Sequence, residues 1–161
     1  MRGPTSSPRS HRAVIAVAIA CLVVLSGPAN VSGASPETDL RRLINMDRKQ
    51  RDLRPLKGAR KADRLAEQHS RRMARSGQIS PSRNLPRKLE NRGYRFRSWA
   101  QNVGCHRSVR RFHRATMRRR SSRKNVLGPR FRRVGIGVAR TPADPDVCNG
   151  ATVWVTEIFF G

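Results

Sequence analysis

The stretch RRRSSRKNVLGPRF, residues 118–131, places six Arg or Lys residues in fourteen positions. Guanidinium and ammonium groups bind phosphate and carboxylate oxygens, and a guanidinium often does so through two parallel hydrogen bonds. The side chains of this stretch that we assign to polyanion binding are Arg118, Arg119, Arg120, Arg123 and Lys124. Whether the stretch is a nucleic-acid arm or a part of the fold that carries arginines depends on the rest of the chain.

The cysteines suggest a crosslink. Cys105 and Cys148 are the two cysteines outside the N-terminal leader described below. In an exported chain, two cysteines point to one disulfide, because zinc motifs need closely spaced pairs that this sequence lacks. In the chain-entropy model, a bond that closes the loop over residues 105–148 stabilises the fold by roughly 4 kcal/mol.

Neither a nucleophile nor a metal-ligand set is recognisable in the sequence. Ser121 and Ser122 lie outside any G-x-S-x-G frame and lack an identifiable Asp/His pair. His106 and His113 are two helical turns apart and could share a face, but a third ligand is missing nearby. His69 stands on an apolar helical face and is interpreted as a packed, half-buried histidine. We therefore predict no catalytic residue, no metal and no cofactor.

Residues 1–34 have the layout of a secretory signal peptide. Basic residues precede an uncharged apolar run over residues 13–25, and the segment GPANVSGA ends in small residues. The run is shorter than the roughly 20 residues that span a bilayer as a helix. We expect cleavage after Ala34, a secreted protein, and one domain over residues 35–161. Cys21 leaves a lipoprotein as an alternative, although the apolar residues after it favour an ordinary leader.

The charge is strongly basic, with 35 Lys and Arg against 10 Asp and Glu. Loss of the leader removes three basic residues, and the 32 that remain comprise 27 Arg and 5 Lys, spread over every predicted element. This spread indicates a compositional bias towards arginine, yet the resulting potential attracts polyanions in either case. Because no nucleic-acid-binding module is recognisable, the expected partners are anionic cell-wall polymers or lipid headgroups, with non-specific nucleic acid as an incidental one.

The secondary-structure elements that must position these residues come in the order of helices in the N-terminal part and a strand pair at the C-terminal end of the sequence. Periodic apolar residues predict helices over about 39–53, with Asp39 as the cap, over 58–75 with Gly77 as the stop, and over 108–119, with one short turn at 86–91. Residues 99–104 predict a short strand, and residues 131–139 and 151–160 predict an antiparallel pair. Gly135 and Gly137 are interpreted as strand glycines that allow close packing. This order is typical of an α+β sandwich.

Five segments, in this order and spacing, resemble the bacterial secreted branch of the CAP superfamily, the relatives of cysteine-rich secretory proteins, antigen 5 and plant pathogenesis-related proteins. The segments are LINMDRKQRDLRPLK (43–57), LAEQHSRRMARSGQIS (65–80), WAQNVG (99–104), MRRRSSRKNVLGPRFRRVGIGVA (117–139) and VWVTEIFFG (153–161). The resemblance implies an α-β-α sandwich with a small antiparallel sheet, in which Cys105 and Cys148 come close together. It also implies that residues 118–131 are part of the fold, because bacterial members read S-P-G-H-R-x-N-I-L in that frame.

The resemblance also locates a cleft. Relatives carry a His, a Glu and a His there, and some of them bind a divalent metal with these residues; the matching positions here are Pro81, Gln101 and Ser122. Proline offers no side-chain ligand, glutamine is a neutral amide, and serine is a poor zinc ligand, so the metal site is expected to be absent. Glu157 stands near the cleft where relatives commonly have Gln, and it is interpreted as solvated or paired with an arginine.

These observations lead to one hypothesis and two alternatives. The hypothesis is a secreted CAP-like protein that is a non-catalytic binding module at an anionic cell surface or wall polymer. One alternative is a hydrolase with a rearranged cleft. The other is a polyanion-binding or nucleic-acid-binding effector in which the fold merely displays arginines.

Overall fold

The computed structural model describes residues 1, 3 and 34–161 of the chain. Apart from residues 1, 3 and 34, the predicted signal peptide therefore lies outside the described residues. Residues 34–161 lie in one compact unit. Within the described residues, no helix has both the length and the apolar character needed to cross a membrane.

The first helix, α1 (Pro36–Lys49), begins three residues before Asp39, the predicted cap. Ser35 caps it, because its Oγ accepts a hydrogen bond from the Thr38 N–H at 3.3 Å. The prediction of Asp39 as the cap was wrong, since a serine followed by a proline is an even better start. Asp39 instead lies in the first turn, where a negative charge favours the helix dipole.

The second helix, α2 (Arg60–Ser76), confirms the helix predicted over 58–75 to within two residues at its start. Gly77 ends it in the left-handed conformation, with φ of 67°. The side chains of α2 that are buried are Ala62, Leu65, Ala66, His69, Ser70 and Met73. The short turn is also present, as α3 (Leu85–Glu90).

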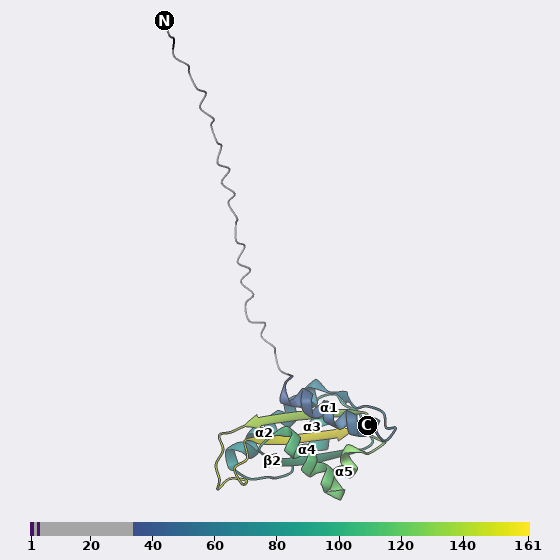
Figure 1. Ribbon diagram of the computed structural model, residues 1–161. Coiled ribbons are helices and arrows are strands. Elements are labelled where there is room, and N and C mark those ends of the chain that lie inside the picture. Colours follow the sequence, from purple (N-terminus) through teal and green to yellow (C-terminus); the bar gives the residue numbers. More distant parts are fainter. Residues whose placement is uncertain (2, 4–33) are drawn as a thin grey trace. The chain divides into compact units, whose positions relative to one another are not determined.

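Four strands form the sheet, in the order β1-β3-β4-β2. They are β1 (Lys57–Gly58), β2 (Trp99–His106), β3 (Arg133–Arg140) and β4 (Val153–Phe160). The predicted antiparallel pair is confirmed as β3 and β4, and β2 also runs antiparallel to β4. The sequence did not predict β1, which is two residues long and pairs parallel with β3. Figure 1 shows β4, in yellow, between β3 and β2.

Helices cover both faces of this sheet, as the predicted α-β-α sandwich requires. Successive side chains of β4 point to opposite faces. Val155 and Phe159 join a core with residues of α1, of α4 (Val109–Arg118) and of α5 (Arg120–Val126). Ile158 and Phe160 join a second core with residues of α2 and α3. The fold class is therefore α+β, as predicted.

Two glycines of β3 let α2 lie directly on the sheet. A Cβ atom at Gly135 would collide with Ala62, and one at Gly137 would collide with the backbone of Ala66 and Glu67. The buried Ser70 hydroxyl donates to the Gly137 carbonyl at 2.9 Å, which fixes the helix at this point. The interpretation of both glycines as packing glycines is confirmed.

The arginine-rich stretch 118–131 is part of the fold. Helix α4 ends at Arg118, Arg119 is extended, and α5 begins at once. The fully buried Arg48 of α1 holds the end of α5, because its Nη1 donates to the carbonyls of Val126 at 2.7 Å and Gly128 at 3.1 Å. Buried carbonyls at a helix end need such donors. A free nucleic-acid arm is thereby excluded for these residues.

Candidate functional site

A cavity of about 680 Å³ lies against β2. Within the described residues β2 pairs with β4 alone, so its other edge is free of strand partners. Val103, Gly104 and Cys105 of β2 line the cavity, Ile79 reaches it from the loop after α2, and Phe112 reaches it from α4. The cavity therefore lies where a strand edge, a loop and a helix meet.

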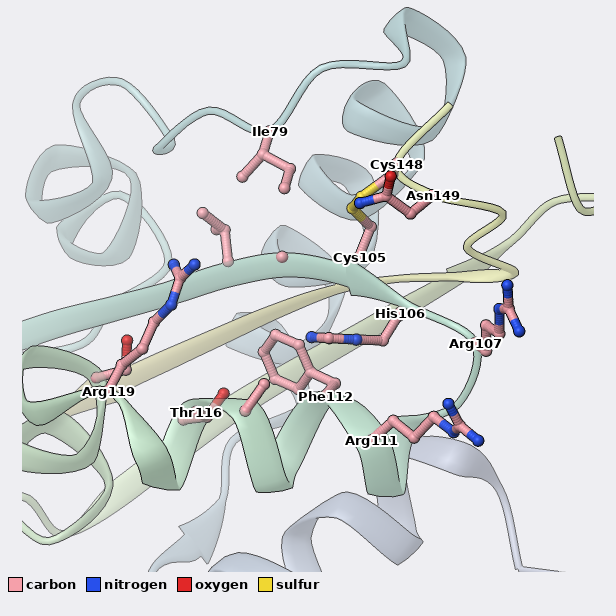
Figure 2. Close-up of a pocket in the computed structure, with 14 residues that line it drawn as sticks. Ile79, Cys105, His106, Arg107, Arg111, Phe112, Thr116, Arg119, Cys148 and Asn149 are labelled. Atoms are coloured by element: carbon pink, nitrogen blue, oxygen red, sulfur yellow. A yellow bond between two sulfur atoms is a disulfide. The ribbon is translucent and has the colours of Figure 1, made fainter. Parts of the chain in front are cut away.

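Three arginines surround this cavity, namely Arg107, Arg111 and Arg119. Arg107 and Arg111 lie on either side of Ser108, the residue that caps α4, and Arg119 is the extended residue between α4 and α5. Figure 2 shows Arg119 at one end of the group and the other two arginines at the opposite end. Among the described residues, those lining the cavity include no Asp or Glu. None of these described lining side chains therefore neutralises the positive charge of the three arginines.

His106 lies between the arginines at the end of β2 and packs edge-on against Phe112, with the ring centroids 6.3 Å apart. Burial, with the charges of Arg119 and Arg111, lowers the pKa of His106 below its ordinary value. At neutral pH the ring is therefore uncharged, and it can both donate and accept a hydrogen bond.

The two spaced histidines do not share a face, so that interpretation was wrong. His106 belongs to β2, whereas His113 lies on α4 and points to α1, where its Nε2 is 2.6 Å from Asp47 Oδ2. Spacing in sequence predicts a shared face only when both residues lie on one helix. In the part of the chain that the structure describes, no three His, Cys, Asp or Glu side chains gather as a metal site requires.

The predicted disulfide between Cys105 and Cys148 is present, with the Cα atoms 6.4 Å apart. Both cysteines line the cavity, as does Asn149. Cys148 and Asn149 have positive φ angles of 52° and 53°. The disulfide thus ties the loop between β3 and β4 to β2 and makes it one wall of the cavity.

The three family cleft positions lie around the middle of β2. Gln101 is half-buried, and its Oε1 accepts a hydrogen bond from the Ser82 N–H at 2.9 Å, which places it beside Pro81. Ser122 of α5 lines the arginine-lined cavity, and its carbonyl accepts from Asn102 Nδ2 at 3.2 Å. Pro81 does not line this cavity but a separate one of about 750 Å³, on the other side of the loop.

Glu157 is fully buried in β4, so its interpretation as solvated was wrong. Its Oε2 accepts a hydrogen bond from Asn102 Nδ2 at 2.9 Å, and Asn102 Oδ1 in turn accepts from Asn125 Nδ2 at 2.8 Å. Among residues 34–161 no arginine pairs with Glu157, and its Oε1 has no hydrogen-bond partner. Burial raises the pKa of Glu157 to about 7. Asn102 Nδ2 also donates to the Ser122 carbonyl, so Asn102 links this buried carboxyl to α5.

Only part of the predicted polyanion-binding set reaches the cavity. Arg119 lines it, whereas Arg118 lines a smaller adjoining hollow together with His106 and Arg111. The remaining members are exposed on α5: Arg120, Arg123 and Lys124. Sequence reasoning missed Arg107 and Arg111. Their signal was their position, since they come within six residues after Cys105 and lie on both sides of a helix-capping serine.

Comparison with known proteins places this geometry in a family. The family model described as CAP, the cysteine-rich secretory protein family, matches residues 41–158. A search of curated proteins finds no match.

Solved structures share the fold. An extracellular protein containing a SCP domain from Bacillus anthracis is similar with a TM-score of 0.64 and 19% identity, over 78% of this chain and 40% of that one. A cysteine-rich secretory protein from Staphylococcus aureus gives 0.62 and 20%, over 78% and 38%. An outer surface protein from Borrelia burgdorferi gives 0.65 and 13%, over 78% and 91%. The chain thus spans about two fifths of the first two proteins. With the family model matched over most of its length, the chain belongs to the cysteine-rich secretory protein (CAP) family.

Proposed function

We propose that this protein is a secreted, non-catalytic binding module that holds a linear anionic polymer of the cell wall in the arginine-lined cavity at the free edge of β2. The observation that carries the proposal is the set of three guanidinium groups around one cavity whose described lining residues include no acid. Export is supported by the extracellular proteins among its structural relatives.

The cavity suits a repeating unit with a charged and a neutral part. The guanidinium groups of Arg107, Arg111 and Arg119 can donate paired hydrogen bonds to phosphate or carboxylate oxygens. Neutral His106 and the half-buried Ser122 offer uncharged hydrogen-bonding groups to hydroxyls. Phe112 supplies an apolar surface for the carbon skeleton of the unit.

Binding is favoured over hydrolysis of a sugar polymer because the described residues that line the cavity include no pair of carboxyl groups. Hydrolases of sugar polymers use two carboxyl groups beside the bond that breaks. The described lining residues contribute none, and the Glu157 carboxyl is fully buried behind the Asn102 side chain. The hydrolase alternative would require that buried carboxyl to reach the substrate.

A polymer is favoured over a lipid surface by the distribution of exposed apolar residues. A protein that lies in a membrane interface presents a continuous apolar face. In residues 34–161, the exposed large hydrophobic residues are Met46, Ile79 and Trp99, which belong to α1, the loop after α2 and the start of β2. Single residues on separate segments do not form such a face.

Titration calorimetry with synthetic oligomers of glycerol phosphate tests the proposal. The double variant Arg111→Ala/Arg119→Ala is compared with Arg54→Ala/Arg95→Ala, which removes the same charge from exposed arginines that line neither cavity. Charge-assisted hydrogen bonds are each worth about 1.5–3 kcal/mol, so the cavity variant should lose at least about tenfold in affinity. The control should lose less than about threefold, because screening weakens distant charges.

Equal losses of affinity in the two variants would contradict the cavity as the binding site. They would favour the alternative of an effector in which the fold merely displays arginines. Duplex DNA and vesicles of anionic phospholipid serve as comparison ligands in the same titration. The assignment to a wall polymer would be wrong if DNA or the vesicles bound more tightly than the glycerol phosphate oligomer at physiological salt.

A further inference from the structure

We infer that a second anion subsite lies across the loop of residues 78–83, so that one polymer chain binds in both hollows at once. The inference rests on the proposed function, and it adds a second site and a minimum ligand length to it. It is carried by the second cavity, the hydrogen bonds that hold its arginine, and the loop that both cavities share.

The second hollow has a volume of about 750 Å³ and lies between the C-terminal half of α2 and the loop. Its basic lining residues are Arg72, Arg75, Arg83 and Lys88, and within the described residues that line it there is no Asp or Glu. Three of these four are exposed, and only Lys88 is half-buried. Two unneutralised basic hollows therefore lie next to each other on this domain.

Hydrogen bonds to His69 hold Arg72 in the second hollow. The Nε2 of buried His69 lies 2.7 Å from the Ser80 carbonyl, which can only accept, so this nitrogen carries the proton. The Nδ1 atom of the neutral ring then accepts from Arg72 Nη2 at 3.2 Å. The other N–H groups of the guanidinium stay available to a ligand. One histidine thus orients the arginine and fastens the loop.

The loop is a thin and fixed partition between the hollows. Ile79 lines the first, and its chain neighbours Gln78 and Ser80 line the second. Consecutive Cα atoms are about 3.8 Å apart, so the wall is a single segment of chain. It is anchored on one side by the bond from His69 to Ser80 and on the other by that from Ser82 to Gln101. A polymer would cross the exposed residues Ile79, Ser80 and Pro81 to occupy both hollows.

A ligand long enough to reach both subsites gains affinity from its own length. Once one end is bound, the second contact is intramolecular, and the effective concentration of the tethered end raises the apparent affinity by about 10²–10⁴-fold where the geometry allows both contacts. A ligand too short to cross the loop has no such gain. Length dependence therefore distinguishes two linked subsites from one.

The test uses glycerol phosphate oligomers, a dimer and an octamer, titrated by calorimetry into the exported protein. For the wild type, we expect the octamer to bind at least about tenfold more tightly than the dimer after correction for the number of binding frames. In Arg72→Ala/Arg83→Ala this gain should fall below about threefold, with dimer affinity for the first cavity unchanged. The matched control Arg54→Ala/Arg95→Ala should keep the gain.

A second variant, Arg75→Ala/Arg83→Ala, keeps the hydrogen bond between Arg72 and His69. It therefore tests the second hollow even if Arg72→Ala/Arg83→Ala does not fold. The inference would be overturned if the octamer kept its higher affinity over the dimer in both variants, or if the wild type bound the two oligomers equally well. In either case, binding of the dimer would still support the proposed function. The dimer is assigned to the first cavity if Arg111→Ala/Arg119→Ala no longer binds it while the two variants of the second hollow bind it with wild-type affinity. A wild type that binds neither oligomer would overturn both proposals.

Discussion

Replacing the buried Glu157 by glutamine should stabilise the protein at neutral and alkaline pH. Burial raises the pKa of Glu157 in the folded protein from its ordinary value of 4.5 to about 7. The folded protein binds the proton of the Glu157 carboxyl more tightly than the unfolded chain does. The contribution of this proton to the free energy of unfolding is therefore fully present below about pH 4.5 and is lost as the pH rises to about 7. Above that pH the loss stays constant.

The size of the effect follows from the shift. One pKa unit corresponds to about 1.36 kcal/mol, so ionised Glu157 costs about 3 kcal/mol of folding free energy. Glutamine has the same shape and keeps an oxygen that accepts from Asn102 Nδ2. Glu157→Gln should therefore unfold with a free energy up to about 3 kcal/mol higher than the wild type at about pH 8, and within about 0.5 kcal/mol of it at about pH 4.

Urea denaturation of oxidised protein at a series of pH values measures this difference. The fluorescence of Trp154 is a suitable probe, since the side chain is buried and becomes exposed on unfolding. Glu67→Gln is the control, because Glu67 is half-exposed in a surface pair with Arg71 and should contribute little. A difference between Glu157→Gln and wild type that does not change with pH, or a variant that is less stable at about pH 8, would refute the reasoning.

Three further substitutions test the framework around the site by the same urea measurement. Removing the disulfide with Cys105→Ser/Cys148→Ser should lower the free energy of unfolding by roughly 4 kcal/mol, and a loss under about 1 kcal/mol would contradict its role. Arg48→Met leaves buried carbonyls at the end of α5 without donors and should cost about 3 kcal/mol; a cost below about 0.5 kcal/mol would mean that water replaces the guanidinium. Gly137→Ala should cost at least about 1–3 kcal/mol through its collision with α2, and wild-type stability would show that the helix can move away.

The sequence predicted the elements that carry their own periodic signal. Helix α2 has an apolar stripe and a stop glycine, and β3 and β4 are rich in β-branched residues, so all three were placed correctly. Strand β1 was missed because its two residues carry no period of their own. The start of α1 was misplaced because Asp39, four residues after the observed cap Ser35, is also of a residue type that caps helices.

The candidate site was harder to predict because it forms between segments distant in sequence. Arg119, Arg107 and Ile79 come from different elements, and only the fold brings them to one cavity. Charge density along the chain pointed to the basic side chains of residues 118–124, and of these Arg119 alone lines that cavity. The misreading of Glu157 has the same origin, since the alternation of β4 does not reveal which helix covers each face.

The position of β4 in the sheet has a consequence for biosynthesis. It is the last strand in sequence, yet it lies between β3 and β2 and supplies the pairing partner of both. Among the described strands, β2 therefore has no partner until residues 153–160 have been made, and the two cores close only then. The sheet therefore cannot be assembled stepwise from its N-terminal side, because the strand that joins β3 to β2 is made after both of them.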